Sequence, residues 1–229
     1  MKMKKFISLA AVVVAVAGLV SCTQNDNPVL PEESSLPSAP YAFDEGSLVV
    51  NGQCDGAEVQ SYWVHEHRAD GYVDGAAQIV SDPADPKNRC VAVTIRSEEE
   101  AREAGNPTLD GDGNFADWDS QFFITFPEEK ALVAGDKVRL TMKVKADAAQ
   151  TAGTQSHKNP GGYIHWYCVG DVNFTADWTE FDSDWKDVTD DGSWGHAQAG
   201  MYTIAFNLAK GAKNTVYFDD IRIEVQHAN

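Results

Sequence analysis

The sequence YIHWYC, at residues 163–168, is the stretch from which we derive the expected fold. Aromatic and β-branched residues dominate it, and the turn-forming sequences NPGG (159–162) and GD (170–171) flank it, so we expect a β-strand. Because the side chains of a strand alternate between its two faces, one face carries Ile164, Trp166 and Cys168. The opposite face carries Tyr163, His165 and Tyr167.

The face with two tyrosines and a histidine suggests a ligand as well as a fold. Each of these rings has a flat apolar body and a polar tip, which suits a sugar, because a sugar offers a ring to stack on and hydroxyls to satisfy. A strand buried on both faces, or a buried histidine with one satisfied partner, would explain the same pattern without a ligand.

Similar short segments recur along the chain, separated by loops rich in Gly, Asp and Pro. Alternation is cleanest in residues 138–146, where every second residue is apolar and lysine, arginine or threonine lies between them. Such a series predicts an all-β, two-sheet β-sandwich. Residues 97–105 allow a helical turn, but their glutamates favour a solvated loop. The expected strands cover residues 47–51, 59–65, 77–80, 89–96, 118–126, 138–146, 163–168, 178–188, 201–208 and 215–225.

The N-terminus has the features of an export signal. Three lysines at positions 2, 4 and 5 precede an apolar run over residues 6–20, and the sequence LVSC at 19–22 matches a bacterial lipobox. We therefore expect a signal peptide at residues 1–22 with lipid attached to Cys22, although a plain secretory signal with an incidental cysteine has the same charge pattern. Residues 23–40 are rich in Pro, Ser, Asn and Glu and predict a flexible tether, so the folded domain should span residues 41–229.

The signal peptide and lipobox predict a protein that is anchored by lipid in the outer membrane of the bacterial cell envelope. They do not show whether the folded domain faces the periplasm or the outside of the cell. The chain has a formal net charge of −17, and cleavage before Cys22 would remove three lysines and no acidic residue. That charge argues against nucleic acid as a partner and against membrane contact other than through the anchor. It fits a neutral ligand, calcium, or a role in solubility alone.

Three further cysteines, Cys54, Cys90 and Cys168, remain after the lipobox cysteine. Their number is odd and their spacing matches no metal motif. One disulfide with one buried thiol, or three buried thiols, are both open.

Six segments together resemble a known family: WDSQFFI (118–124), TQSH (154–157), YIHW (163–166), FTADW (174–178), TIAFNL (203–208) and VYFDDI (216–221). They resemble, in their order along the chain, the jelly-roll carbohydrate-binding modules that accompany or are inserted into bacterial endo-xylanases. The resemblance runs from about residue 48 to residue 225. It implies a jelly roll with a glycan cleft on the concave face of one sheet, and non-catalytic binding of a xylan-like β-glycan, with other glycan-utilisation proteins as expected partners.

Strand parity, combined with this resemblance, selects the residues of the expected cleft. The rings would stack on sugar faces, and the polar groups would bond to the hydroxyls. Gln121 and Asn207 also fit loop-capping or strand-edge positions. Trp178 and Trp185 are expected to be structural, and Trp194 is a less favoured rim position. The predicted carbohydrate-binding residues are Trp63, Trp118, Asp119, Gln121, Phe123, Tyr163, His165, Tyr167 and Asn207.

Two segments are candidates for calcium. The sequence DGDGN at 110–114 spaces oxygen ligands as in a calcium loop, but Phe115 and Gln121 occupy the positions where an EF-hand has glycine and glutamate, so an irregular loop or a plain turn remains. The family resemblance implies a structural calcium between the first and last strands. Asp55 would contribute to it together with Asp219 or its neighbour Asp220, although Cys54 departs from the family's pattern.

Three classes of function follow. A glycan-binding lipoprotein fits best, a structural or adhesive lipoprotein with the same sandwich comes second, and a glycoside hydrolase comes third. Asp119 is the only carboxylate among the predicted cleft residues, and neither a nucleophile elbow nor a metal-hydrolase motif is present in the sequence. We therefore expect a protein that binds its ligand without cleaving it.

Overall fold

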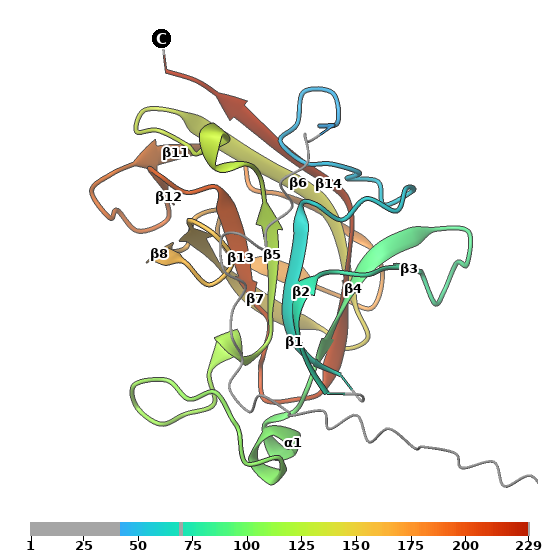
Figure 1. Cartoon of the computed structure of the whole chain (residues 1–229). Coiled ribbons are helices and arrows are strands. Elements are labelled where there is room, and N and C mark those ends of the chain that lie inside the picture. The colour runs from blue at the N-terminus through green and yellow to red at the C-terminus, as the bar shows by residue number, and fades with distance from the viewer. Residues whose placement is uncertain (1–41, 69–70, 229) are drawn as a thin grey trace, which may run out of the picture.

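The computed structural model describes residues 42–68 and 71–228 (Figure 1). The predicted signal peptide, Cys22 and the tether at residues 23–40 lie outside the described residues. Within the described ranges, the helices are all too short or too polar to cross a bilayer.

The described chain folds into two packed β-sheets, which we call sheet A and sheet B (Figure 1). Sheet A contains, in spatial order, β2 (Gly71–Ala76), β1 (Tyr62–Arg68), β5 (Gln121–Thr125), β13 (Thr203–Asn207), β7 (Gln150–His157) and β8 (Tyr163–Trp166), with β9 (Val172–Phe174) paired to β7. Sheet B contains β12 (Ala197–Gln198), β11 (Lys186–Thr189), β6 (Lys137–Ala146), β14 (Asn214–Gln226), β4 (Arg89–Ile95) and β3 (Ile79–Ser81), with β10 (Thr179–Asp182) paired to β6. Successive strands β4, β5, β6 and β7 alternate between the sheets, as in a jelly roll, and the predicted two-sheet sandwich is confirmed.

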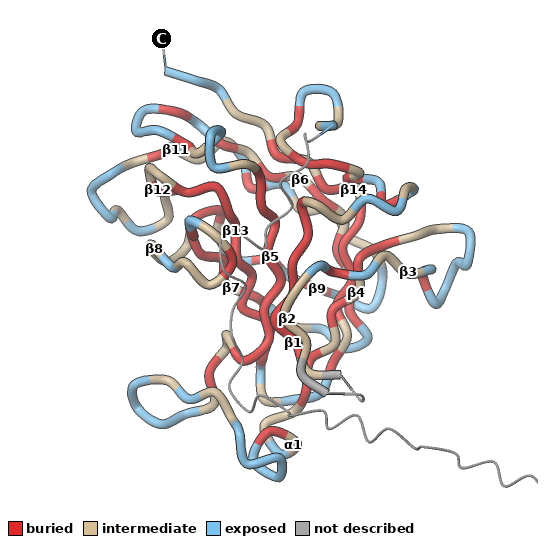
Figure 2. Tube along the Cα trace, in the orientation of Figure 1, coloured by how far each residue is buried: buried red, intermediate tan, exposed pale blue. Residues whose placement is uncertain are grey.

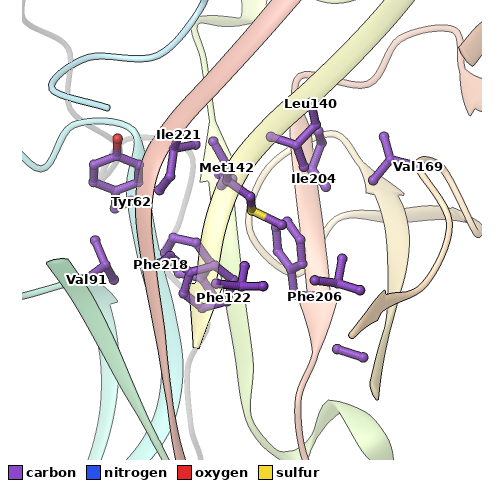
Figure 3. Packing of buried hydrophobic residues seen from close by; sticks show 14 of the residues in the cluster. Tyr62, Val91, Phe122, Leu140, Met142, Val169, Ile204, Phe206, Phe218 and Ile221 are labelled. Atoms are coloured by element: carbon purple, nitrogen blue, oxygen red, sulfur yellow. The ribbon is translucent and has the colours of Figure 1, made fainter. Parts of the chain in front are cut away.

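The core lies between the sheets and is built from every second residue of the central strands. Phe122 of β5 and Phe218 of β14 come from opposite sheets, and their ring centroids are 4.3 Å apart (Figure 3). Phe206 of β13 lies 5.8 Å from the first ring and 5.5 Å from the second. Buried segments run along the middle of both sheets (Figure 2). The inward parity predicted for residues 138–146 is confirmed, because their apolar side chains are at most 3% exposed.

Several predicted strand boundaries were wrong. Residues 47–51 form bends and no strand, although Val49 is buried and Leu48 N donates to Ile223 O at 2.8 Å. The single strand expected over residues 178–188 is divided into β10 and β11. Strand β7 has the polar sequence QTAGTQSH and was not predicted. It forms because β13 and β8 pair with it on either side and satisfy its backbone groups.

The loop expected after β4 contains a short helix, α1 (Glu98–Glu103). Its N-cap is Ser97, whose Oγ accepts a hydrogen bond from Glu100 N at 3.1 Å, while the Glu100 side chain accepts from Ser97 N at 2.9 Å. This reciprocal capping box satisfies two backbone donors, and the glutamates of the first turn complement the positive end of the helix dipole. The glutamates that suggested a solvated loop therefore support a helix. Two 3₁₀ turns, η2 (Asp117–Asp119) and η3 (Glu128–Lys130), complete the helical elements of the described chain.

Cys54, Cys90 and Cys168 are free and buried, which selects the second of the two open alternatives for them. Burial raises the pKa of the Cys168 thiol to about 12, so this side chain is a protonated, apolar core residue at neutral pH.

Candidate functional site

Sheet A has one face against the core and one face turned away from sheet B, which we call the outer face. Strand register arranges the side chains of this outer face in rows across the sheet. Four of the predicted site residues, from three different strands, fall in the two central rows; the sequence predicts this for Gln121, Phe123 and Asn207, whereas it predicts Trp63 at the rim. The first row is Trp63, Phe123, Ala205, Gln155 and Trp166, and the second is His65, Gln121, Asn207 and Gly153.

The second row carries polar side chains that are held in place by hydrogen bonds. Gln121 Nε2 donates to Asn207 Oδ1 at 2.7 Å, and His65 Nδ1 donates to Asp74 Oδ1 at 2.7 Å. Asn207 Nδ2 has no hydrogen-bond partner among the described residues, although Asn207 is fully buried. Because β5 and β13 are central strands, Gln121 and Asn207 are not strand-edge residues. An unsatisfied buried N–H donor is costly, so Asn207 is an unusual residue to find at the centre of this sheet.

Trp63 and Phe123 form a small apolar cluster with Ala205 in the middle of the outer face. Trp63 is 6% exposed and Phe123 is 1% exposed, so neither is the exposed ring that the sequence predicts. Trp63 lies on β1, which is flanked by β2 and β5, and this central position explains why it is not on a rim.

Strand β8 does not alternate as the sequence predicts. Tyr163 pairs with His157 and His165 pairs with Ser156, so Ile164 is an extra residue, and the bulge puts Tyr163 and Trp166 on the same face. His165 then lies on the side of Ser156, opposite the outer face. The prediction that His165 faces the cleft is therefore wrong, and Trp166 is a site residue that the sequence reasoning missed.

Tyr167 leaves the strand directly after Trp166. Its φ of +64° is in the left-handed region, and its backbone N donates to Thr154 O at 2.6 Å. Its hydroxyl donates to Asp171 Oδ2 at 2.6 Å, and this hydrogen bond raises the pKa of the Tyr167 phenol. The ring is thereby fixed at the end of the outer face.

A pocket of about 520 Å³ opens at the end of the outer face where β7, β8 and β13 meet. The rings of Trp166 and Tyr167 line it. Trp118 and Tyr163 contact Trp166 edge-on, with centroid distances of 6.2 and 6.0 Å. The polar lining comprises Asp117, Gln150, Thr151, Asp171, Asn207 and Lys210. Of the predicted residues, Tyr167 and Asn207 line this pocket, and Trp118 and Tyr163 stand beside its tryptophan.

Asp119 has a structural partner, contrary to its predicted role. Arg96 donates through Nε and one terminal nitrogen to the two carboxylate oxygens, at 2.8 and 2.7 Å, and both side chains are buried. Thr108 N donates to the same carboxylate at 2.9 Å. Burial acts to raise the pKa of Asp119, but the hydrogen bonds from Arg96 and Thr108 and the charge of Arg96 together outweigh it and hold this pKa below its usual value. The carboxylate is therefore occupied in joining β4 to the loop before β5.

Asp55 and Asp219 line one pocket, together with Lys143 and Trp178. Asp219 already accepts hydrogen bonds from Asn88 Nδ2 at 3.0 Å and from Asp220 N at 2.8 Å, and burial raises the pKa of its carboxyl group. Across residues 42–68 and 71–228, no cluster of three or more His, Cys, Asp or Glu side chains could hold a metal ion. These carboxylates thus supply only part of the six to eight oxygens that calcium requires, and the calcium site stays a prediction.

The sequence DGDGN at 110–114 forms a turn. Asp110 Oδ1 accepts hydrogen bonds from Asp112 N at 2.9 Å and from Asn114 N at 2.8 Å, both within the same loop. The plain turn is the simpler of the two interpretations that the sequence left open.

No protein-family model matches the sequence, and no curated protein matches it. Solved structures of carbohydrate-binding modules are similar to it in fold. A family 4 module (CBM4) has 22% identity and a TM-score of 0.48, over 78% of this chain and 99% of the module. The N-terminal cellulose-binding domain of β-1,4-glucanase C from Cellulomonas fimi has 10% identity and a TM-score of 0.45, over 76% and 93%. The xylan-binding domain CBM22-1 of Xyn10C from Paenibacillus barcinonensis has 13% identity and a TM-score of 0.46, over 83% and 100%. Each is a likeness of fold at low identity, and the cellulose and xylan named for the last two domains are those domains' own ligands.

Proposed function

We propose that this protein is a lipid-anchored envelope protein that binds a β-linked, xylan-like polysaccharide without hydrolysing it. The observation that carries the proposal is the pocket at the end of the outer face of sheet A, where the side chains of Trp166 and Tyr167 and a set of polar residues line the same cavity. A sugar presents an apolar ring face and equatorial hydroxyls, so it can stack on the rings while its hydroxyls bond to the polar side chains of the lining.

The state of the pocket's carboxylates supports binding over hydrolysis. Asp171 accepts a hydrogen bond from the Tyr167 hydroxyl, and Asp117 is paired with Lys210. A glycosidase needs one carboxyl group as an acid and a second as a base or nucleophile, on opposite sides of the scissile bond. Two carboxylates already engaged with other side chains are poorly suited to these roles.

Affinity electrophoresis of the full chain in gels that contain xylan, β-glucan or β-galactan tests the proposal. Wild-type protein should be retarded most by xylan. Trp166→Ala should weaken binding by about tenfold to a hundredfold, because one ring–sugar stack is worth about 1–3 kcal/mol. The matched control is Trp178→Ala, since Trp178 Nε1 donates to Asp82 on the far side of sheet B, and its loss should leave binding unchanged in folded protein.

Two outcomes would overturn the proposal. A folded wild-type protein that is retarded by none of the three polysaccharides would exclude this ligand class. Release of reducing ends from xylan would show that the protein is a hydrolase.

A further inference from the structure

The loop between β11 and β12, at residues 190–196, carries the most exposed large apolar side chain among the described residues. Trp194 is 64% exposed, and its ring stacks on that of Tyr167, with centroids 4.8 Å apart and an interplanar angle of 29°. In Figure 1 this orange loop stands at the left of the molecule, beside β8. One face of the indole is thus covered by a tyrosine, while most of the residue remains exposed.

The side chains of His165 and Gln198 hold the backbone of this loop in place. His165 Nε2 donates to Gly192 O, and a Cβ added at Gly192, whose φ is +70°, would lie 3.4 Å from the His165 ring. The Gln198 side chain is 3% exposed; its Oε1 accepts from Gly192 N at 3.2 Å, and its Nε2 donates to His196 O at 3.1 Å. These contacts fix the loop backbone before any ligand arrives, which lowers the entropic cost of binding to Trp194.

Tyr167 connects this loop to the pocket. It lines the pocket together with Trp166, and the same ring stacks on Trp194. A bulky residue with a φ of +64° is an outlier that the surrounding structure must maintain, and such outliers cluster at ligand sites. Here the Asp171 carboxylate and Thr154 O maintain it. Tyr167 therefore contacts both the pocket and Trp194, and this places Trp194 next to the pocket.

We propose that Trp194, supported by Tyr167, is an outer subsite that stacks on one neutral pyranose ring of a β-glycan whose neighbouring sugars fill the pocket. The inference rests on the proposed function. A neutral ring is favoured because Asp171, Asp190 and Asp191 all lie on the segments that form this end of the molecule, and they would repel a uronic acid. In this arrangement His165 is a positioning residue, because it holds the loop and does not face the pocket.

Calorimetric titration of the full chain with β-1,4-xylo-oligosaccharides of two to six sugars tests the subsite. Trp194→Ala should weaken binding of the hexasaccharide on the order of tenfold, and leave binding of the disaccharide within about twofold of wild type, because the short ligand fills only the pocket. Trp194→Phe should keep most of the affinity for the hexasaccharide. Val133→Ala removes another exposed apolar side chain, 57% exposed, and should change neither affinity.

The dependence on ligand length separates this inference from the proposed function. Two results for Trp194→Ala would exclude the outer subsite: wild-type affinity for the hexasaccharide, or an equal loss of affinity for both ligands. If Trp166→Ala abolishes binding in the same experiment, the pocket remains the binding site. If wild-type protein binds none of the oligosaccharides, the proposed function and the subsite both fall. If Trp194 instead mediates association with another protein chain, Trp194→Ala should leave the affinity for every oligosaccharide unchanged, and this result would exclude the subsite.

Discussion

Asp119 and Arg96 form a buried ion pair with bidentate geometry. Arg96 is 5% exposed and Asp119 is fully buried, and the guanidinium also donates to the Asn106 side chain at 2.6 Å. Removing two charges from water is costly, and the cost is offset only when the remaining donors and acceptors are satisfied, as they are here. The pair fixes the long segment between β4 and β5 at the end of the outer face.

Asp119→Ala should destabilise the protein by about 3–5 kcal/mol, because it leaves the Arg96 guanidinium buried without a counter-charge. Urea unfolding followed by tryptophan fluorescence measures the loss. The matched control is Asp187→Ala, which removes an exposed ion pair with Lys137 and should have little effect. Equal stabilities of the two variants would contradict a structural role for Asp119.

The same carboxylate makes stability depend on pH. Its pKa in the folded protein is lower than in the unfolded chain, so its contribution is complete above the ordinary carboxyl pKa of about 3.9 and is lost as pH falls through the folded value. The melting temperature should therefore fall on acidification below about pH 4. Asp119→Ala should show a smaller fall over that range, and an identical fall would show that other groups control acid unfolding.

At the scale of single elements, the stability of helix α1 depends on a few contacts. It has six residues, too few for a helix that is stable by propensity alone, and Ala101 is its one buried residue. The capping box of Ser97 and Glu100, and the ion pair of Glu100 with Lys213 at 2.6 Å, hold it in place.

Ser97→Ala should cost about 1 kcal/mol, because it removes the acceptor for Glu100 N at the N-cap. Hydrogen exchange should show faster opening of the amides of residues 98–103, with β6 and β14 unchanged. Glu103→Ala lies in the same helix at an exposed position outside its first turn and serves as the control. Uniform acceleration across the whole protein would mean that the helix does not open locally.

At the scale of the whole molecule, the proposed anchor predicts where the protein is found. Cys22→Ser should move the protein from the membrane fraction to the soluble fraction, because the sequence predicts lipid on this cysteine and the described residues contain no membrane-spanning helix. Fractionation followed by immunoblotting measures the shift, and metabolic labelling with a fatty acid should be lost in parallel. Membrane association that persists in the variant would exclude Cys22 as the anchor.

The predicted calcium also acts on the whole fold, since Asp55 and Asp219 lie near opposite ends of the described chain. If calcium binds there, millimolar calcium should raise the melting temperature and a chelator should lower it, by mass action on the folded state. Asp219→Asn should abolish the calcium-dependent shift. If the melting temperature after exhaustive dialysis changes with neither calcium nor chelator, the predicted calcium site is wrong.

The sequence by itself determined which faces of the central strands are buried. The period-two pattern assigned Phe122, Ile204 and Phe206 to the core, and therefore placed Gln121, Phe123 and Asn207 together on the other face. This worked because alternation is a local property of an extended chain, and a sandwich needs one apolar face on each sheet.

Only the tertiary structure decided which side chains form the open end of that face. The bulge at Ile164 depends on how β8 pairs with β7, so residues 163–168 alone could not show that Trp166 and not His165 lies on the outer face. The partners Arg96 and Asp119 are 23 residues apart, and Trp194 reaches Tyr167 from the other sheet. Such contacts depend on the pairing of distant strands, and alternation within a single segment carries no information about them.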